Sequence, residues 1–280
     1  MEFTIMTRVY WNCYRWPGRT FNFTLFQILR RIARSGYRAV DLCEYPLEFW
    51  PLTMKEEDKK KLKSELEALG LRASGITIPT FSPGLELIPV KEDREIIVER
   101  IMKAIELIYY LEGKTVMYGI CPVEIFGTPR DKTYQWTLEI FRRCAPLAED
   151  RGIDIAVEFV NRAFPSSESI NEFLDEVGFD NVGLCLEVGN INARPRDEPL
   201  LEHMERCKDR IKLVHIVDPL NEKWLKEIGV NMESVIRKLK ELGYDGYLVM
   251  EGFAKSIDCS KLDDEVSKTI KYLRELIKRL

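Results

Sequence analysis

The feature of this sequence that most restricts its fold is a regular alternation, along all 280 residues, of short apolar runs with longer amphipathic segments. The apolar runs have few polar interruptions, as is typical of strands buried on both faces. A first strand is expected near 4–11, and the other seven at 39–44, 73–78, 115–118, 154–158, 182–187, 211–217 and 247–251. Strands that alternate with helical patterns indicate β/α units and a parallel sheet.

The segments between these runs carry apolar residues three or four positions apart, opposite a charged face, which predicts amphipathic helices. The clearest stripes are Leu62, Leu66 and Leu69; Ile97, Ile101, Ile105 and Ile108; Val235, Leu239 and Leu242; and Val266, Ile270, Leu273, Ile277 and Leu280. Eight such units predict one (β/α)8 TIM barrel domain over residues 1–280. The alternative is an open doubly wound sheet, which normally carries a glycine-rich phosphate loop that this sequence lacks.

Composition narrows the classes of function. A formal net charge of −4 without a basic stripe argues against nucleic acid as a partner. Neither a leader pattern nor a run of about 18 apolar residues occurs, so we expect a cytoplasmic protein without a membrane partner. The seven cysteines form no C-x-x-C pair, which argues against a zinc knuckle. Only two Gln stand beside 88 charged residues, a bias that favours a thermophile protein.

Polar side chains stand at the carboxyl ends of several predicted strands. They are Glu44, Glu158, Glu187, His215 and Glu251. The last four belong to four successive strands, and the carboxyl ends of barrel strands converge on the face where active sites lie. Long loops are expected on the same face at 79–90, 119–133, 188–199 and 218–231.

Three carboxylates at one corner of a barrel repel one another unless they take up protons or share a cation. One imidazole with three carboxylates suits Mn²⁺, Co²⁺ or Mg²⁺, with Zn²⁺ as the alternative. The other histidine, His203, is expected on a surface helix in a structural or solvated role. Two histidines are too few for a hydrolase with several zinc ions.

At these residues the sequence resembles the xylose isomerase-like barrel superfamily of sugar isomerases and epimerases, most clearly from residue 150 onward. Within it, the sequence is most similar to the ketose 3-epimerases, such as D-tagatose 3-epimerase. The resemblance is carried by GYRAVDLCE at 36–44, VEFVNR at 157–162, VHIVDP at 214–219 and VMEGF at 249–253. It implies a metal held by Glu158, Glu187, His215 and Glu251, with the two outer glutamates also acting as the catalytic acid–base pair.

The sequence departs from the family pattern at four positions. The strand-six residue, usually Asp, is Glu187, and the His three positions later is Asn190. The carboxylate that follows the family's Asn-Arg pair corresponds to Phe164, and the Arg after the strand-seven His corresponds to Asn221. The longer carboxylate at 187 moves the ligating oxygens by about 1.5 Å. The departures concern mainly the contacts with substrate.

Four residues are predicted to bind substrate: Trp11, Arg162, Asn190 and Asp218. Trp11 would offer a ring face to a sugar, or else pack against the barrel rim. Arg162, beside Asn161, would orient substrate oxygens or pair with neighbouring loops. Asp218 would hold the His215 ring through a hydrogen bond, or else cap the next helix.

The expected activity is a divalent-metal-dependent isomerase or epimerase that acts on a small sugar or keto-polyol through a metal-stabilised enediolate. One alternative is a metal-dependent dehydratase, a lyase, of a keto-polyol or cyclitol. A second is endonuclease-type repair of abasic DNA, against which the acidic composition and the two histidines argue. A third is a catalytically inactive barrel. The expected partner is a small-molecule sugar or polyol, and a homo-oligomer is compatible because barrels of this type often associate.

Overall fold

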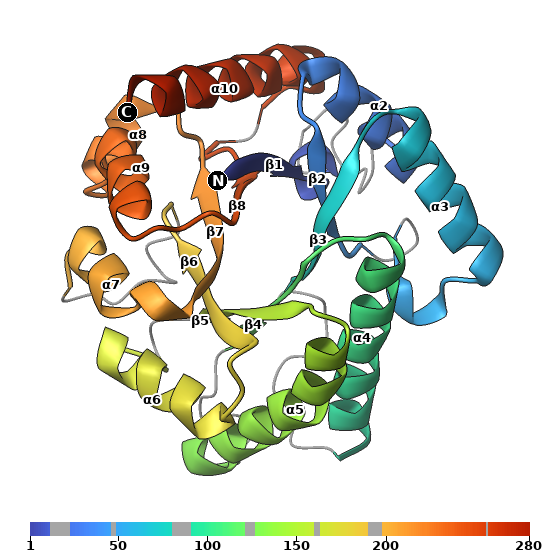
Figure 1. Cartoon of the computed structure of the whole chain (residues 1–280), viewed down its shortest axis with the longest axis vertical. Coiled ribbons are helices and arrows are strands. Elements are labelled where there is room, and N and C mark those ends of the chain that lie inside the picture. Colours follow the sequence, from blue (N-terminus) through green and yellow to red (C-terminus); the bar gives the residue numbers. More distant parts are fainter. Residues whose placement is uncertain are drawn as a thin grey trace.

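Eight parallel strands pair in chain order, and the first pairs with the last, so that the sheet closes into a barrel (Figure 1). The structure is a computed structural model that describes residues 1–11, 23–45, 49–79, 91–120, 127–159, 163–189, 198–255 and 257–280. The strands are β1 (Glu2–Met6), β2 (Ala39–Cys43), β3 (Arg72–Ile78), β4 (Thr115–Ile120), β5 (Asp154–Phe159), β6 (Val182–Glu187), β7 (Ile211–Val217) and β8 (Tyr247–Gly252). The closed barrel confirms the predicted fold class and rules out the open sheet.

The helices form a ring outside the strands (Figure 1). They are α1 (Arg8–Trp11), α2 (Leu25–Ser35), α3 (Glu56–Ala68), α4 (Lys91–Tyr110), α5 (Arg130–Asp150), α6 (Ser167–Val177), α7 (Leu200–Arg206), α8 (Glu222–Glu227), α9 (Met232–Glu241) and α10 (Cys259–Arg279). Most residues of the predicted apolar stripes are buried in α3, α4, α9 and α10. Those at the ends of the stripes, Leu69, Leu242, Ile277 and Leu280, are only partly buried. Within the described part of the chain, no helix is both long enough and apolar enough to cross a membrane.

Local sequence signals set the ends of α2. The side chain of Thr24 accepts a hydrogen bond from the backbone N–H of Gln27, and the Gln27 side chain accepts one from the N–H of Thr24. This reciprocal cap satisfies two N–H groups that a helix start leaves free. The helix ends at Gly36, whose φ of +104° lies in the left-handed region that glycine adopts at little cost.

The first strand is shorter than the predicted segment 4–11. It ends at Met6, and the chain then turns into the short helix α1, where Tyr10 N–H donates to the carbonyl of Thr7. The hydroxyl of Thr7 accepts a hydrogen bond from Cys43 N–H at 2.9 Å, which ties this turn to the end of β2. The prediction placed residues 8–11 in the strand because apolar and aromatic residues continue beyond its last sheet pairing.

Two of the predicted long loops are shorter than expected. In the segment 119–133, β4 extends to Ile120 and α5 begins at Arg130. The segment 218–231 contains α8, whose start is capped by the Asn221 side chain. The segments 79–90 and 188–199 lie mostly outside the described residues.

Candidate active site

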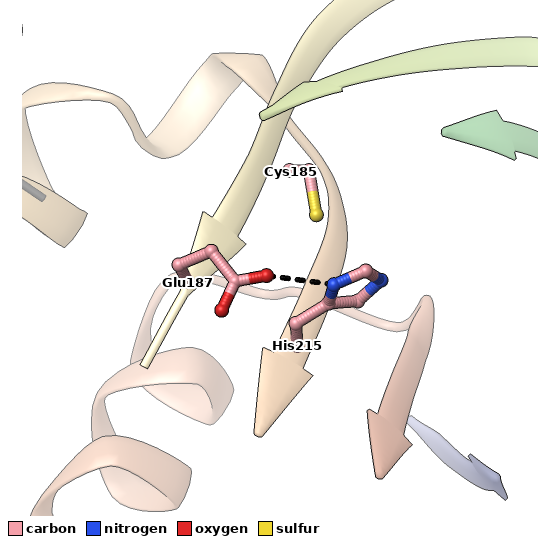
Figure 2. Close-up of side chains that lie close together, drawn as sticks. All are labelled: Cys185, Glu187 and His215. Atoms are coloured by element: carbon pink, nitrogen blue, oxygen red, sulfur yellow. Dashed lines mark hydrogen bonds and ion pairs between the residues drawn. The ribbon is translucent and has the colours of Figure 1, made fainter. Parts of the chain in front are cut away.

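Glu187 and His215 form the buried centre of the site, at the carboxyl ends of β6 and β7. The sheet register pairs these two residues directly, so their side chains point to the same side of the sheet. Glu187 Oε1 lies 2.7 Å from His215 Nδ1, and both side chains are fully buried (Figure 2). Both residues therefore stand near the carboxyl ends of successive strands, where the sequence predicted them.

Glu158 and Glu251 lie on the two flanking strands, β5 and β8, and both are only partly buried. Burial raises the pKa of Glu158 to about 8, and the negative charges of Glu187 and Glu251 add to this rise. Burial and the charge of Glu251 likewise raise the pKa of Glu187. The three carboxylates thus lie close enough together for negative charge to raise the pKa of Glu158 and of Glu187.

A cation at the start of α1 lies beside these carboxylates. Arg8 follows the end of β1 and forms an ion pair with Glu251, with 2.8 Å between Nη2 and Oε1. The charge of Arg8 also lowers the pKa of Glu158 and of Glu187, which partly offsets their mutual repulsion. Arg8 was not among the predicted site residues because the expected first strand, 4–11, placed it in the interior of the strand.

Cys185 is a second residue that the sequence analysis missed. Its Sγ, a carboxylate oxygen of Glu187 and a ring nitrogen of His215 lie within 4.8 Å of one another. Among the described residues, only two of the four predicted metal ligands thus lie in this tight group, and a thiol is its third member. Cys185 stands two positions before Glu187, on the same face of β6, and this spacing could have revealed it.

The donor set of this corner fits a divalent metal. Glu187 Oε2 and His215 Nε2 are buried and make no hydrogen bond with the described residues. Burial alone lowers the pKa of the His215 imidazole, but Cys185 and Glu187 outweigh this effect and raise it well above its usual range. A bound cation would take these two buried atoms as ligands and would balance the excess negative charge of the carboxylates.

The structure gives Asp218 partners other than the predicted one. Its Oδ2 accepts hydrogen bonds from Asn221 Nδ2 at 3.1 Å and from Ala254 N–H at 3.2 Å. The predicted bond to His215 is absent among the described residues: Nδ1 of that ring pairs with Glu187, and Nε2 makes no hydrogen bond there. Nor does Asp218 cap α8, since Asn221 does so. Asp218 instead ties the loop after β7 to the loop after β8.

The other predicted contact residues are placed as follows. Trp11 is buried in α1, and its ring packs against Tyr45 with centroids 4.9 Å apart, the rim-packing role. A contact between Trp11 and substrate stays a prediction. Arg162 and Asn190, like Asn161, lie outside the described residues.

Two departures from the family pattern have structural roles. Phe164 is buried in an aromatic cluster with Phe159 and Phe173, at ring-centroid distances of 4.7 and 5.3 Å. Asn221 accepts a hydrogen bond from Trp224 N–H at 3.2 Å and so begins α8. Packing and helix capping account for both residues without a contact to substrate.

The remaining polar candidates are structural. His203 is buried, not on the surface, and its Nδ1 lies 2.8 Å from Ser167 Oγ. Glu44 is fully buried and accepts a hydrogen bond from Arg100 Nε at 2.5 Å, while the Arg100 guanidinium lies over the ring of Trp50. Burial raises the pKa of Glu44 to about 7, although Arg100 opposes the rise.

Comparisons with known proteins agree with the fold and identify the family. An uncharacterized protein of Methanocaldococcus jannaschii is 26% identical over 189 residues, 63% of this chain and 64% of that protein. A ketose 3-epimerase of Arthrobacter globiformis is 26% identical over 260 residues, 86% of this chain and 82% of that one. The crystal structure of D-psicose 3-epimerase from Clostridium cellulolyticum H10 with D-tagatose has the same fold, with a TM-score of 0.75 over 99% of both chains at 16% identity. The family model for the xylose isomerase-like TIM barrel matches residues 29–276, and the chain therefore belongs to that family.

Proposed function

We propose that this protein is a divalent-metal-dependent epimerase or isomerase of a small ketose or keto-polyol. The observation that carries the proposal is the meeting of Glu158, Glu187, His215 and Glu251 at the carboxyl ends of four adjacent strands. Active sites of such barrels lie at this end. The similarity to a ketose 3-epimerase of Arthrobacter globiformis and to the structure of D-psicose 3-epimerase from Clostridium cellulolyticum supports the proposed reaction class.

The four residues would hold the metal, and Mn²⁺, Co²⁺ or Mg²⁺ suits a set of one imidazole and three carboxylates. When bound, a divalent ion polarises a carbonyl group and makes the adjacent C–H more acidic. The ion pair of Arg8 with Glu251 keeps a positive charge at the same corner, where it stabilises negative charge on the substrate. Trp11, Arg162, Asn190 and Asp218 remain the proposed substrate contacts.

Glu158 and Glu251 are the proposed acid–base pair. They come from β5 and β8, which flank the two strands that carry Glu187 and His215. One carboxylate takes the proton from the carbon next to the carbonyl, and the other returns a proton to the opposite face of that carbon. The configuration at the carbon is then inverted, and no other bond is broken. General acid–base groups of this kind contribute about 10²–10⁴-fold to a rate.

The test is proton exchange in D₂O. Purified protein is supplied with Mn²⁺, Co²⁺ or Mg²⁺ and with a panel of ketoses and keto-polyols, and NMR follows deuterium at the carbons next to the carbonyl. We expect deuterium incorporation with epimer formation, and a loss of at least about 10²-fold in Glu158→Gln and in Glu251→Gln. Glu172→Gln, an exposed change on α6, is the control.

The outcomes separate the proposal from its alternatives. Undiminished exchange in both glutamine variants would remove the two residues from the mechanism. Deuterium incorporation followed by loss of water would indicate a dehydratase instead. No exchange with any metal or substrate, in protein that binds metal and is folded, would favour an inactive barrel.

A further inference from the structure

Cys185 lies beside the Glu187–His215 pair, two residues before Glu187 in β6. Residues two positions apart in a strand share a face, so the Cys185 side chain enters the barrel on the side that carries Glu187. Figure 2 shows its sulfur pointing toward the imidazole ring of His215. The Cys185 side chain is fully buried and forms no disulfide. It therefore belongs to the inner wall of the site.

The distances in this group suit the ligands of one ion. Sγ of Cys185, an oxygen of Glu187 and a nitrogen of His215 lie within 4.8 Å of one another. Metal–ligand bonds of about 2.0–2.3 Å place two ligands of one ion at most about 4.5 Å apart, so a small side-chain rotation closes the group. In the same pair, Glu187 Oε2 and His215 Nε2 are buried without hydrogen-bond partners among the described residues.

Other buried cysteines of the barrel differ in their surroundings. Sγ of Cys144, on α5, donates to the carbonyl oxygen of Val98 at 3.8 Å, and Sγ of Cys43 donates to that of Glu44 at 3.6 Å. Their thiols pack as small apolar groups with a weak backbone contact. Cys185 faces a carboxylate and an imidazole instead, which are metal-binding groups.

We propose that the Cys185 thiolate is an additional ligand of the divalent ion and makes the centre selective for thiophilic metals, Zn²⁺ and Co²⁺ over Mg²⁺ and Mn²⁺. The inference rests on the metal site of the proposed function and extends its ligand set. On binding, the S–H bond breaks, a metal–sulfur bond forms, and the proton passes to the buffer. Soft thiolate ligands shift selectivity toward zinc, whereas carboxylates alone favour magnesium and manganese.

The test is a Co²⁺ titration of the reduced, metal-free protein. Sulfur bonded to Co²⁺ gives a near-ultraviolet charge-transfer band, which oxygen and nitrogen ligands do not give. We expect this band in the wild type and in Cys144→Ser, and its loss in Cys185→Ser and Cys185→Ala. We also expect the ratio of Zn²⁺ to Mn²⁺ affinity, measured by chelator competition, to fall at least about tenfold in both Cys185 variants.

The possible outcomes can be told apart without any assay of activity. Stoichiometric Co²⁺ without the band, or a band that persists in both Cys185 variants, would overturn the thiolate ligand and leave the proposed epimerase intact. The band without epimerase activity would overturn the proposed function and leave the thiolate ligand in place. Failure of the folded wild type to bind any divalent ion would overturn both.

Discussion

At the scale of single residues, Arg8 is the side chain whose effect on the site is easiest to measure. It forms an ion pair with Glu251 and contributes positive charge at Glu158 and Glu187. A divalent cation competes with this guanidinium for the same carboxylates. We expect Arg8→Met to bind Mn²⁺ about three- to tenfold more tightly, because a partly buried ion pair is worth about 1 kcal/mol. Isothermal titration calorimetry measures the change.

The matched control is Arg30→Met. Arg30 pairs with Glu65 between α2 and α3, and the substitution removes the same charge from the protein. Its Mn²⁺ affinity should equal that of the wild type. Weaker binding in Arg8→Met would mean that the arginine holds Glu251 in position for the metal and does not compete with it.

The buried pair of Glu44 and Arg100 carries a prediction about stability. Removal of one partner of a fully buried pair leaves an uncompensated charge and costs about 3–5 kcal/mol. We therefore expect Arg100→Met to lower the free energy of unfolding by that amount in urea titrations. The double variant Glu44→Met, Arg100→Met removes both charges and should recover most of the loss. Equal or greater destabilisation in the double variant would show that the pair itself supports the fold.

The sequence predicted which strand ends carry the polar side chains of the candidate site better than it predicted their contacts. Glu158, Glu187, His215 and Glu251 could be found because each is a polar residue at the end of a buried strand. Contacts such as Arg8 with Glu251 depend on side-chain directions where the first and last strands meet. No local sequence pattern shows which side chains of the first and last strands will meet when the barrel closes. The predicted hydrogen bond between Asp218 and His215 was wrong for the same reason, since the partner Ala254 follows a different strand.

At the scale of elements, the inside of the barrel is set by small residues where strands approach closely. Gly75 in β3 is such a position: a Cβ there would lie 2.3 Å from Thr115 Oγ1 and 2.9 Å from Asp41 Oδ2. We expect Gly75→Ala to lower the free energy of unfolding by about 1–3 kcal/mol, the usual cost of overpacking. Urea unfolding measures it. Gly252→Ala in β8 is the control, because nothing lies within 4 Å of that Cβ, and an equal loss there would exclude overpacking.

The bounds of most elements could be predicted, and the exceptions share a cause. The predicted strand 182–187 matches β6, and 211–217 matches β7, because their apolar runs end where sheet pairing ends. At β1 the apolar and aromatic residues continue through the turn into α1, since Val9, Tyr10 and Trp11 are buried outside the sheet. Hydrophobic residues indicate that a segment is buried, but a buried segment can be a strand or the helix that follows it.

At the scale of the whole molecule, eight repeats of one pattern were enough to predict the closed barrel, because few other architectures bury eight parallel strands. The same closure also creates electrostatic repulsion at the candidate site. The strand ends that close the barrel also bring Glu158, Glu187 and Glu251 together, whose charges repel one another. The stability of the metal-free protein should therefore depend on pH.

The pH dependence follows from the raised pKa of Glu158, about 8 in the fold against about 4.5 in an unfolded chain. Between these values the folded protein holds a proton that the unfolded chain releases. Stability falls with rising pH wherever the folded state binds more protons, so unfolding in urea with a chelator should become easier from about pH 5 to 8. The raised pKa values of Glu187 and His215 act in the same direction.

Glu158→Gln removes one titrating carboxyl group and should weaken the dependence of unfolding free energy on pH. Glu172→Gln on α6 should leave that dependence as in the wild type. A divalent ion should reverse the trend, because it binds deprotonated ligands and stabilises the folded state more strongly as the pH rises. Urea midpoints at about pH 5.5 and about pH 8, with and without Mn²⁺, measure both effects. A metal-free protein that becomes more stable over this range would show that the three carboxylates are held apart in solution, and a shared metal among them would then lose its physical basis.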